Sequence, residues 1–232
     1  MAGRQQKLVF SRRGGKREGA GRPPKGKYGI RHAHRIRVKK HEPIHVSLRA
    51  TKRVGNLRRD GIYAAIRSAT TVVARHPGCR IIHVSIQRTH VHLILEADSG
   101  AALTETMRSF EISAARQINR VLGEGGHVFE RYRASSLSSP RQVRNCLAYV
   151  LNNWRHHGEH QRNATARWTI DKYSSAITFD GWKELGAGAK FAAPAGHEPL
   201  NVWEPKRWLL REGWRRHGLV GITEMPGGSP EG

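Results

Sequence analysis

The chain has 232 residues and a formal net charge of +23, because 41 Lys and Arg face 18 Asp and Glu. This length suits one domain with appendages, and the excess of positive charge indicates a polyanionic partner. Nucleic acid is favoured over an anionic membrane surface, since no long amphipathic basic helix stands out. No run of about 18 apolar residues and no hydrophobic leader is found, so we expect no membrane association and a cytoplasmic, bacterial nucleoid-associated location.

Residues 1–40 form a basic, Gly-rich leader with 14 Lys or Arg and one acid, Glu18. Such a segment cannot bury apolar surface, so we expect it to be disordered when free and to bind DNA. Within it, residues 19–25 resemble the Gly-Arg-Pro core of an AT-hook, which would place Arg22 in an A·T minor groove. A charge tether that grips phosphates anywhere is the alternative interpretation.

The patterns of residues 43–160 predict a compact α+β domain. Alternation of apolar and polar side chains predicts strands over 44–49, 80–86 and 90–97, and helical spacing predicts helices over 57–74 and 103–122. A basic, aromatic extended segment over 128–137 follows. The last helix, 140–157, has a sharp start, with Ser139 as N-cap, Pro140 in the first position and Gln142 closing a capping box. The order β-α-β-β-α-β-α predicts a ferredoxin-like (split β-α-β) fold with a four-stranded antiparallel sheet and an added helix.

Residues 161–232 form an extension rich in Gly, Pro and Trp. Trp168, Trp182, Trp203, Trp208 and Trp214 lie in an otherwise polar stretch. Aromatic side chains in such number are costly to leave in water. We therefore expect the extension to pack on the body, with a short helix near 205–217.

Two histidines on the strand over 90–97 are the first candidate site residues. Side chains alternate across a strand, so His90 and His92 project from one face, while Val91, Leu93 and Leu95 line the other. Two neutral imidazoles fixed side by side suit a divalent metal ion. The spacing alone is weak evidence, because satisfied strand histidines give the same pattern.

The last helix adds a phenol and a carboxamide. Val143, Leu147, Val150, Leu151 and Trp154 form its apolar stripe. Tyr149 and Asn153 lie to one side of that stripe, one turn apart on a common face. A site that cuts phosphodiesters would use His90, His92 and Asn153 as metal ligands and Tyr149 as the nucleophile, with the cation favouring the phenolate.

These motifs together resemble the single-tyrosine HUH transposases, in particular the REP-associated (RAYT-type) tyrosine transposases of the IS200-like family. The matching segments are His90-Val91-His92-Leu93, Glu96-Ala97, Phe129-Glu130-Arg131-Tyr132 and Tyr149-Val150-Leu151-Asn152-Asn153. The resemblance implies an HUH catalytic fold, Tyr149 as the catalytic residue, His90, His92 and Asn153 as ligands of Mg²⁺ or Mn²⁺, and a 5′-phosphotyrosine intermediate. It also implies a single-stranded, hairpin-forming DNA substrate. Thr89 departs from the family pattern, where Asn commonly precedes the first histidine, so the group that orients His90 is left open.

Basic residues near the proposed site are candidate phosphate contacts. They are Arg88, Arg131, Arg133, Arg141 and Arg144. Solvated charges are the alternative for each. The chain is expected to act as a monomer or a homodimer.

Two other function classes compete with the transposase hypothesis. A catalytically inactive or domesticated DNA-binding protein, acting as a hairpin binder or a repressor, would share the charge and the fold. The intact set of His90, His92, Tyr149 and Asn153 argues against decay. A zinc-dependent deaminase or hydrolase is disfavoured because the Cys pairs and the Glu base expected of that class are missing.

Overall fold

The computed structural model describes residues 36–159 and 170–225. Its strands are β1 (Ile44–Arg49), β2 (Cys79–Ile86), β3 (His90–Ala97) and β4 (Arg133–Ser136). Its helices are α1 (Asp60–Val73), α2 (Gly100–Leu122), α3 (Pro140–His156) and α5 (Trp208–Arg211), joined by the 3₁₀ turns η1 (Lys52–Val54), η2 (Ser175–Thr178) and η3 (Gly213–His217). The AT-hook-like segment with Arg22 lies outside the described residues.

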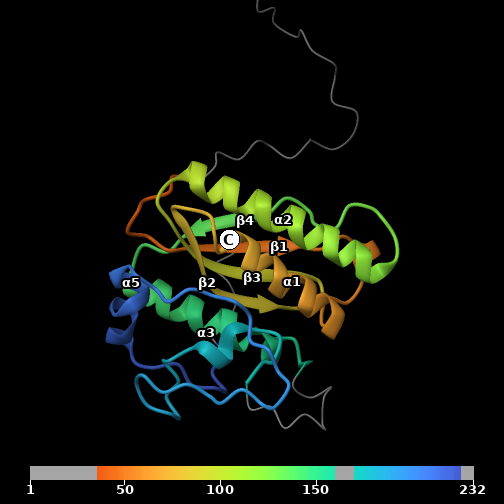
Figure 1. The fold of residues 1–232 in the computed structure, drawn as a ribbon. Helices are drawn as coiled ribbons and strands as arrows, with labels where there is room; N and C mark the ends of the chain where they lie inside the picture. Colours follow the sequence, from red (N-terminus) through yellow and green to blue (C-terminus); the bar gives the residue numbers. More distant parts are fainter. Residues whose placement is uncertain (1–35, 160–169, 226–232) are drawn as a thin grey trace, which may run out of the picture. The chain divides into compact units, whose positions relative to one another are not determined.

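The four strands form one sheet in the order β2-β3-β1-β4, and every neighbouring pair is antiparallel. This order confirms the predicted split β-α-β arrangement, in which the two β-α-β halves interleave so that β1 and β3 lie in the centre. Helices α1 and α2 lie together on one side of the sheet, and α3 lies on the other (Figure 1). Within residues 36–159 and 170–225, no helix combines the length and the apolarity needed to cross a bilayer.

Each face of the sheet builds its own apolar core, which follows from the alternation of side chains along a strand. Ile44, Val46 and Leu48 of β1 point into the core under α1 and α2. The second core draws Ile82 from β2 and Ile94 from β3 and packs them against α3. The α3 side of β1 carries the polar residues of the alternation instead, beginning with His45.

Several element boundaries differ from the sequence-based expectation for local reasons. Helix α1 begins at Asp60 rather than near Leu57, and Asn56 accepts a hydrogen bond from the backbone of Arg58 before the helix starts. Helix α2 begins at Gly100, three residues earlier than expected, because the Ser99 side chain caps it by accepting from the Ala102 amide at 3.1 Å. Strand β4 is only four residues long. The preceding Phe129 pairs with Ala50 as an isolated bridge.

The N-terminus of α3 is capped as the sequence predicts, with one change. The Ser139 hydroxyl accepts a hydrogen bond from the Gln142 amide at 3.3 Å, and Pro140 fills the first helical position. The Gln142 side chain, however, accepts from the backbone and hydroxyl of Ser138 rather than from the backbone of Ser139. The capping box is therefore shifted by one residue, and both groups still fix the start of the helix that carries Tyr149.

The C-terminal extension packs on α3 and along β2. Trp182 and Trp214 are fully buried in the core under α3, whereas Trp203 and Trp208 keep about two fifths of their surface exposed, at 42% and 44%. The backbone amide of Trp203 donates to the carbonyl of Ile81 at 2.8 Å, which adds the extension to the free edge of β2. The extension thus covers a sheet edge that would otherwise present unpaired backbone groups.

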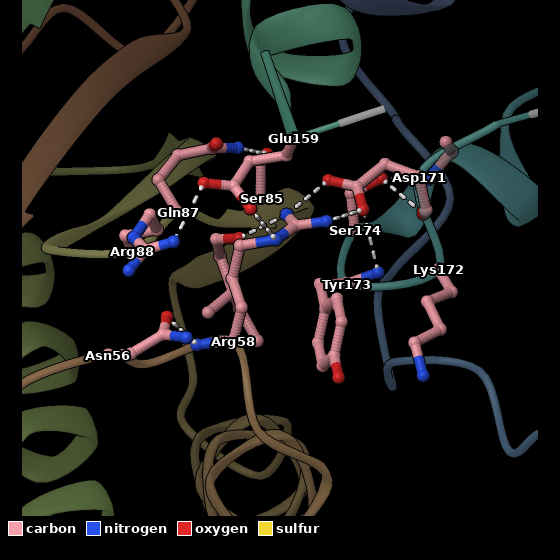
Figure 2. Close-up of polar contacts among 12 residues, drawn as sticks. Asn56, Arg58, Ser85, Gln87, Arg88, Glu159, Asp171, Lys172, Tyr173 and Ser174 are labelled. Carbon is pink, nitrogen blue, oxygen red and sulfur yellow. Dashed lines mark hydrogen bonds and ion pairs between the residues drawn. The ribbon is translucent and has the colours of Figure 1, made fainter. Parts of the chain in front are cut away.

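A buried ion pair ties the extension to the body (Figure 2). The guanidinium of Arg58 donates two hydrogen bonds to the carboxylate of Asp171, at 2.7 and 2.9 Å, and a third to the carbonyl of Ile86 at 2.8 Å. Asp171 also accepts from the amide of Tyr173 at 3.0 Å. The two charged side chains are 4% and 0% exposed, so their charges depend on each other for compensation.

The ion pair makes a testable prediction about stability. Asp171→Ala removes the nearest carboxylate and leaves the buried Arg58 charge with the more distant Glu159 carboxylate, at 3.9 Å, so we expect a loss of about 3 kcal/mol in the free energy of unfolding. Lys172→Ala is the matched control, because Lys172 pairs with the exposed Asp60 and should cost less than about 1 kcal/mol. Urea unfolding followed by fluorescence measures both variants. A cost below about 1 kcal/mol for Asp171→Ala would contradict this account.

Candidate active site

The histidine pair of β3 lies on the face of the sheet that α3 covers. His92 stands opposite Ser47 of β1, and His90 stands opposite Arg49. The two imidazole rings meet edge to face, with centroids 4.6 Å apart. His92 is buried and His90 is half-buried, as expected for a pair that runs from the interior of the sheet towards its end.

Each of these imidazoles has its Nδ1 atom engaged by a neighbour. His92 Nδ1 lies 3.0 Å from Nε2 of His45, and His90 Nδ1 lies 3.2 Å from the hydroxyl of Thr89. Thr89 therefore provides the polar contact to His90 at the position where the sequence left the orienting group open. Nε2 of His92 is buried and has no hydrogen-bond partner. A buried, unpaired ring nitrogen is costly unless something binds it.

Helix α3 places a matching row of side chains against the pair. Tyr149, Asn153 and His157 follow each other at intervals of four residues and so share one side of the helix. The Tyr149 ring lies 5.2 Å from the His92 ring, and the His157 ring lies 5.5 Å from the His90 ring. Asn153 lies between Tyr149 and His157 along the chain, so helical spacing puts it on the side of α3 that is turned towards the histidine pair. The structure thus brings His90, His92 and Tyr149 together and puts Asn153 on the same side of the helix as Tyr149.

The side-chain amide of Asn153 gives further support to a binding site beside the histidines. Its side chain is 1% exposed, and neither Oδ1 nor Nδ2 has a hydrogen-bond partner. The side-chain amide of the preceding residue, Asn152, is paired: it donates to the carbonyls of Gly221 and Glu224, at 2.9 Å each. Buried amides are normally paired. The Asn153 amide and Nε2 of His92 are thus both buried polar groups without a hydrogen-bond partner, a state that a bound cation would relieve.

The imidazoles at the site are uncharged at neutral pH. Burial lowers the pKa of His45 and of His90 to about 4, with smaller contributions from neighbouring positive groups, and burial likewise holds the pKa of His92 well below its usual value. A neutral imidazole keeps a lone pair for a metal ion. In the described part of the chain, no three His, Cys, Asp or Glu side chains converge on a common point, so a third protein ligand would have to be of another kind. Asn153 Oδ1, a buried oxygen without a hydrogen-bond partner, is a candidate of that kind.

The predicted arginines lie in three different settings. Arg131, Arg133 and Arg141 are exposed. The side chain of Arg88 is 46% exposed and lies 3.7 Å from the carboxylate of Glu159. Arg144 is held instead by the carboxylate of Glu224 and by the carbonyl of Leu219, so its proposed contact with DNA would require those bonds to open.

Two further residues belong to this site and were missed from the sequence. His45 contacts the rings of His92 and Tyr149, at 5.1 and 6.2 Å between centroids. Arg49 stands opposite His90 and is exposed, and its charge contributes to lowering the pKa of His90. The alternation of β1 carried the signal, because it places His45, Ser47 and Arg49 together on the face opposite the apolar residues.

The structure also arranges Arg133 in line with the histidine pair. In the antiparallel register, Ser47 of β1 lies opposite His92 on one side and opposite Arg133 of β4 on the other. Directly paired residues share a face of the sheet, so a row of polar side chains crosses from β3 to the edge strand. The side of the site away from the α3 core is therefore basic and polar.

Comparison with known proteins places the chain in a family. Residues 39–153, about half of the chain, match the family described as transposase IS200 like. A REP-associated tyrosine transposase bound to a REP hairpin is similar in structure, with 18% identity, 56% of this chain and 75% of that chain covered, and a TM-score of 0.46. A transposase-like protein from Deinococcus radiodurans has 15% identity, 58% and 97% coverage, and a TM-score of 0.34.

A third similar structure is a bacterial tRNA(His) guanylyltransferase-like protein in complex with GTP, with 9% identity, 57% and 74% coverage, and a TM-score of 0.41. No curated protein matches the chain. The family match spans the sheet, the histidine pair of β3, and α3 as far as Asn153. The chain belongs to the IS200-like transposase family and has a transposase-type function on DNA.

Proposed function

We propose that the chain is a single-stranded DNA endonuclease and strand transferase of the REP-associated tyrosine transposase type, with Tyr149 as its nucleophile. One observation carries the proposal: the face of α3 that bears Tyr149, Asn153 and His157 lies against the His90 and His92 rings of β3. In this proposal a phenol, two neutral imidazoles and an amide oxygen would share one site. This set suits cleavage of a phosphodiester by a tyrosine with the help of a cation.

His90, His92 and Asn153 are the residues that would hold the divalent ion, Mg²⁺ or Mn²⁺. The unpaired Nε2 of His92 and the unpaired Oδ1 of Asn153 fit this role, since both are buried donor atoms without another partner. Mixed nitrogen and oxygen ligands suit Mn²⁺, and they leave positions for phosphate oxygens and water. When bound, the ion would supply positive charge that polarises the scissile phosphate and favours the phenolate form of the nucleophile.

Tyr149 would carry out the bond exchange. Its phenolic oxygen forms a bond to phosphorus, and the bond between that phosphorus and the 3′-oxygen of the preceding nucleotide breaks. The phenol loses one proton and the released 3′-oxygen gains one, so the exchange needs no oxidant or reductant. The resulting 5′-phosphotyrosine is an ester that a 3′-hydroxyl can attack in turn, which makes strand transfer the reverse of cleavage.

The basic face next to the site would guide the DNA strand. Arg49 and Arg133 are exposed on β1 and the edge strand β4, on the same face of the sheet as His90 and His92. Guanidinium groups are well suited to phosphate oxygens. A hairpin-bearing substrate follows from the motif resemblance to the REP-associated group, and the charge of +23 supplies affinity for any DNA.

The alternative is a DNA-binding protein that has lost catalysis and acts as a hairpin binder or a repressor. It would bind hairpins equally well and would leave every strand intact. The unpaired polar atoms of His92 and Asn153 favour the enzyme, because a binding protein gains nothing from keeping them buried.

The nucleophile is tested by Tyr149→Phe, which removes one oxygen atom. We expect the variant to bind a hairpin oligonucleotide with wild-type affinity and to lose both strand cleavage and the covalent adduct. The assay uses a 3′-labelled single-stranded hairpin with Mn²⁺ on a denaturing gel, because the labelled fragment would stay on the protein. Cleavage at the same phosphodiester by Tyr149→Phe would remove Tyr149 from the mechanism. A wild-type chain that binds the hairpin without cutting it would favour the alternative.

The metal site is tested by two neighbouring substitutions. Asn153→Leu removes two unpaired polar atoms, so we expect the metal-free protein to keep its free energy of unfolding or to gain up to about 2 kcal/mol. The same variant should lose the rise in melting temperature that Mn²⁺ gives to the wild type. Asn152→Leu is the matched control: it should lower stability, because two carbonyls lose their donor, and it should keep the response to Mn²⁺. Full stabilisation of Asn153→Leu by Mn²⁺ would exclude Asn153 as a ligand.

The path of the strand is tested by Arg49→Ala. Loss of one phosphate contact should weaken binding of a single-stranded oligonucleotide. It should also make the slope of log affinity against log salt shallower by about 0.7. Arg116→Ala removes the same charge from the exposed surface of α2, on the opposite side of the sheet, and should leave the slope unchanged. Fluorescence anisotropy over a series of salt concentrations measures both. Equal slopes for the two variants would mean that Arg49 contributes only general charge.

A further inference from the structure

His45 is a buried imidazole in the site to which the proposed reaction assigns no role. It lies on the central strand β1, opposite Ile94 of β3 and Ser135 of β4. The planes of its ring and of the His92 ring differ by 23°, as an in-plane hydrogen bond between two imidazoles allows, and it meets the ring of Tyr149 nearly at a right angle. His45 therefore contacts both a proposed metal ligand and the proposed nucleophile.

The contact between His45 and His92 joins two specific nitrogen atoms. Nε2 of His45 and Nδ1 of His92 are 3.0 Å apart, which is a hydrogen-bond distance. Both imidazoles are neutral, so one nitrogen must donate a proton and the other must accept it. The direction of this bond decides which nitrogen of His92 has a free lone pair.

Only one direction leaves His92 able to bind a cation at its buried nitrogen. If His92 donates from Nδ1, its Nε2 has a lone pair, and Nε2 is the atom that is buried without a partner. If His45 donates instead, Nε2 of His92 carries the proton and cannot serve as a ligand. A histidine that binds a metal through one nitrogen usually donates its other N–H to a neighbouring acceptor, which fixes the tautomer and the orientation of the ring.

We infer that His45 is a positioning residue, which accepts the Nδ1 proton of His92 and thereby presents Nε2 of His92 to the divalent cation. This inference rests on the proposed function, since it needs a cation at His92. The acceptor is an uncharged ring held between the sheet and α3, so it fixes His92 without adding negative charge beside the scissile phosphate. Thr89 makes the corresponding contact with Nδ1 of His90, so both ligands would be oriented through the same ring atom.

Two substitutions separate the hydrogen bond from the packing. His45→Gln keeps an uncharged acceptor at the end of the side chain, and His45→Leu keeps apolar bulk without an acceptor. Binding of Mn²⁺ to the full chain, without DNA, is measured from the free-ion signal in electron paramagnetic resonance. We expect His45→Leu to weaken Mn²⁺ binding about 10- to 100-fold and His45→Gln to retain most of the affinity. Both variants should bind the hairpin oligonucleotide like the wild type in the presence of chelator.

The results distinguish this inference from the proposed function. His92→Ala serves as the reference: if it binds Mn²⁺ as the wild type does, the metal site itself is wrong. If His92→Ala loses Mn²⁺ while His45→Leu keeps it, the metal site stands and the positioning role is overturned. Equal losses in His45→Leu and His45→Gln, with unchanged melting temperatures, would also overturn it, because packing rather than the acceptor would then be responsible.

The wild-type protein provides a test that does not depend on how the variants fold. Long-range nitrogen–proton correlation spectra of uniformly ¹⁵N-labelled, metal-free protein report which ring nitrogen of each histidine carries the proton. We expect His92 in the tautomer protonated at Nδ1 and His45 with an unprotonated Nε2. A His92 ring protonated at Nε2 would overturn the inference.

Discussion

The packing of α3 on the sheet is the constraint on which the site depends. Tyr149 and Asn153 are carried by α3, so the position of this helix on the sheet decides whether they lie near the histidines of β3. The apolar stripe with Leu147, Val150 and Leu151 packs on Ile82 and Ile94, and this burial fixes the rotation of α3 about its axis. A turn of the helix by one residue, about 100°, would carry the phenol and the amide away from His92.

The C-terminal extension holds the outer side of the same helix. Trp182 and Trp214 complete the core beneath it, and the side chains of Asn152 and Arg144 bond to residues between Leu219 and Glu224. The two adjacent amides thus differ in role: that of Asn152 anchors the helix to the extension, and that of Asn153 lies on the side of the helix turned towards the histidines. The buried pair of Arg58 and Asp171 secures the start of the extension to the edge of the body. Removing the extension would therefore disturb α3 as well as the Trp core.

The sequence was sufficient for the fold and for the strand and helix faces on which the proposed site residues lie. Alternation over residues 44–49 and 90–97, and the apolar stripe of residues 140–157, are local patterns, and they predicted the strands, the shared face of His90 and His92, and the helix face of Tyr149 and Asn153. The partners of those residues depend on register between distant segments. The hydrogen bond between His45 and His92 and the ion pair of Arg144 with Glu224 join residues 47 and 80 positions apart, and no local pattern signals either.

The central claim is that Tyr149 becomes covalently joined to DNA, and mass spectrometry of the adduct tests it most directly. The full chain is incubated with a hairpin-bearing single-stranded oligonucleotide and Mn²⁺, then digested with nuclease and trypsin. The proposed mechanism predicts a nucleotide phosphate on the peptide 145–155, whose single tyrosine is Tyr149. An adduct on a peptide that carries Tyr63, Tyr132 or Tyr173 would contradict it, as would a cleaved strand with no product attached to the protein.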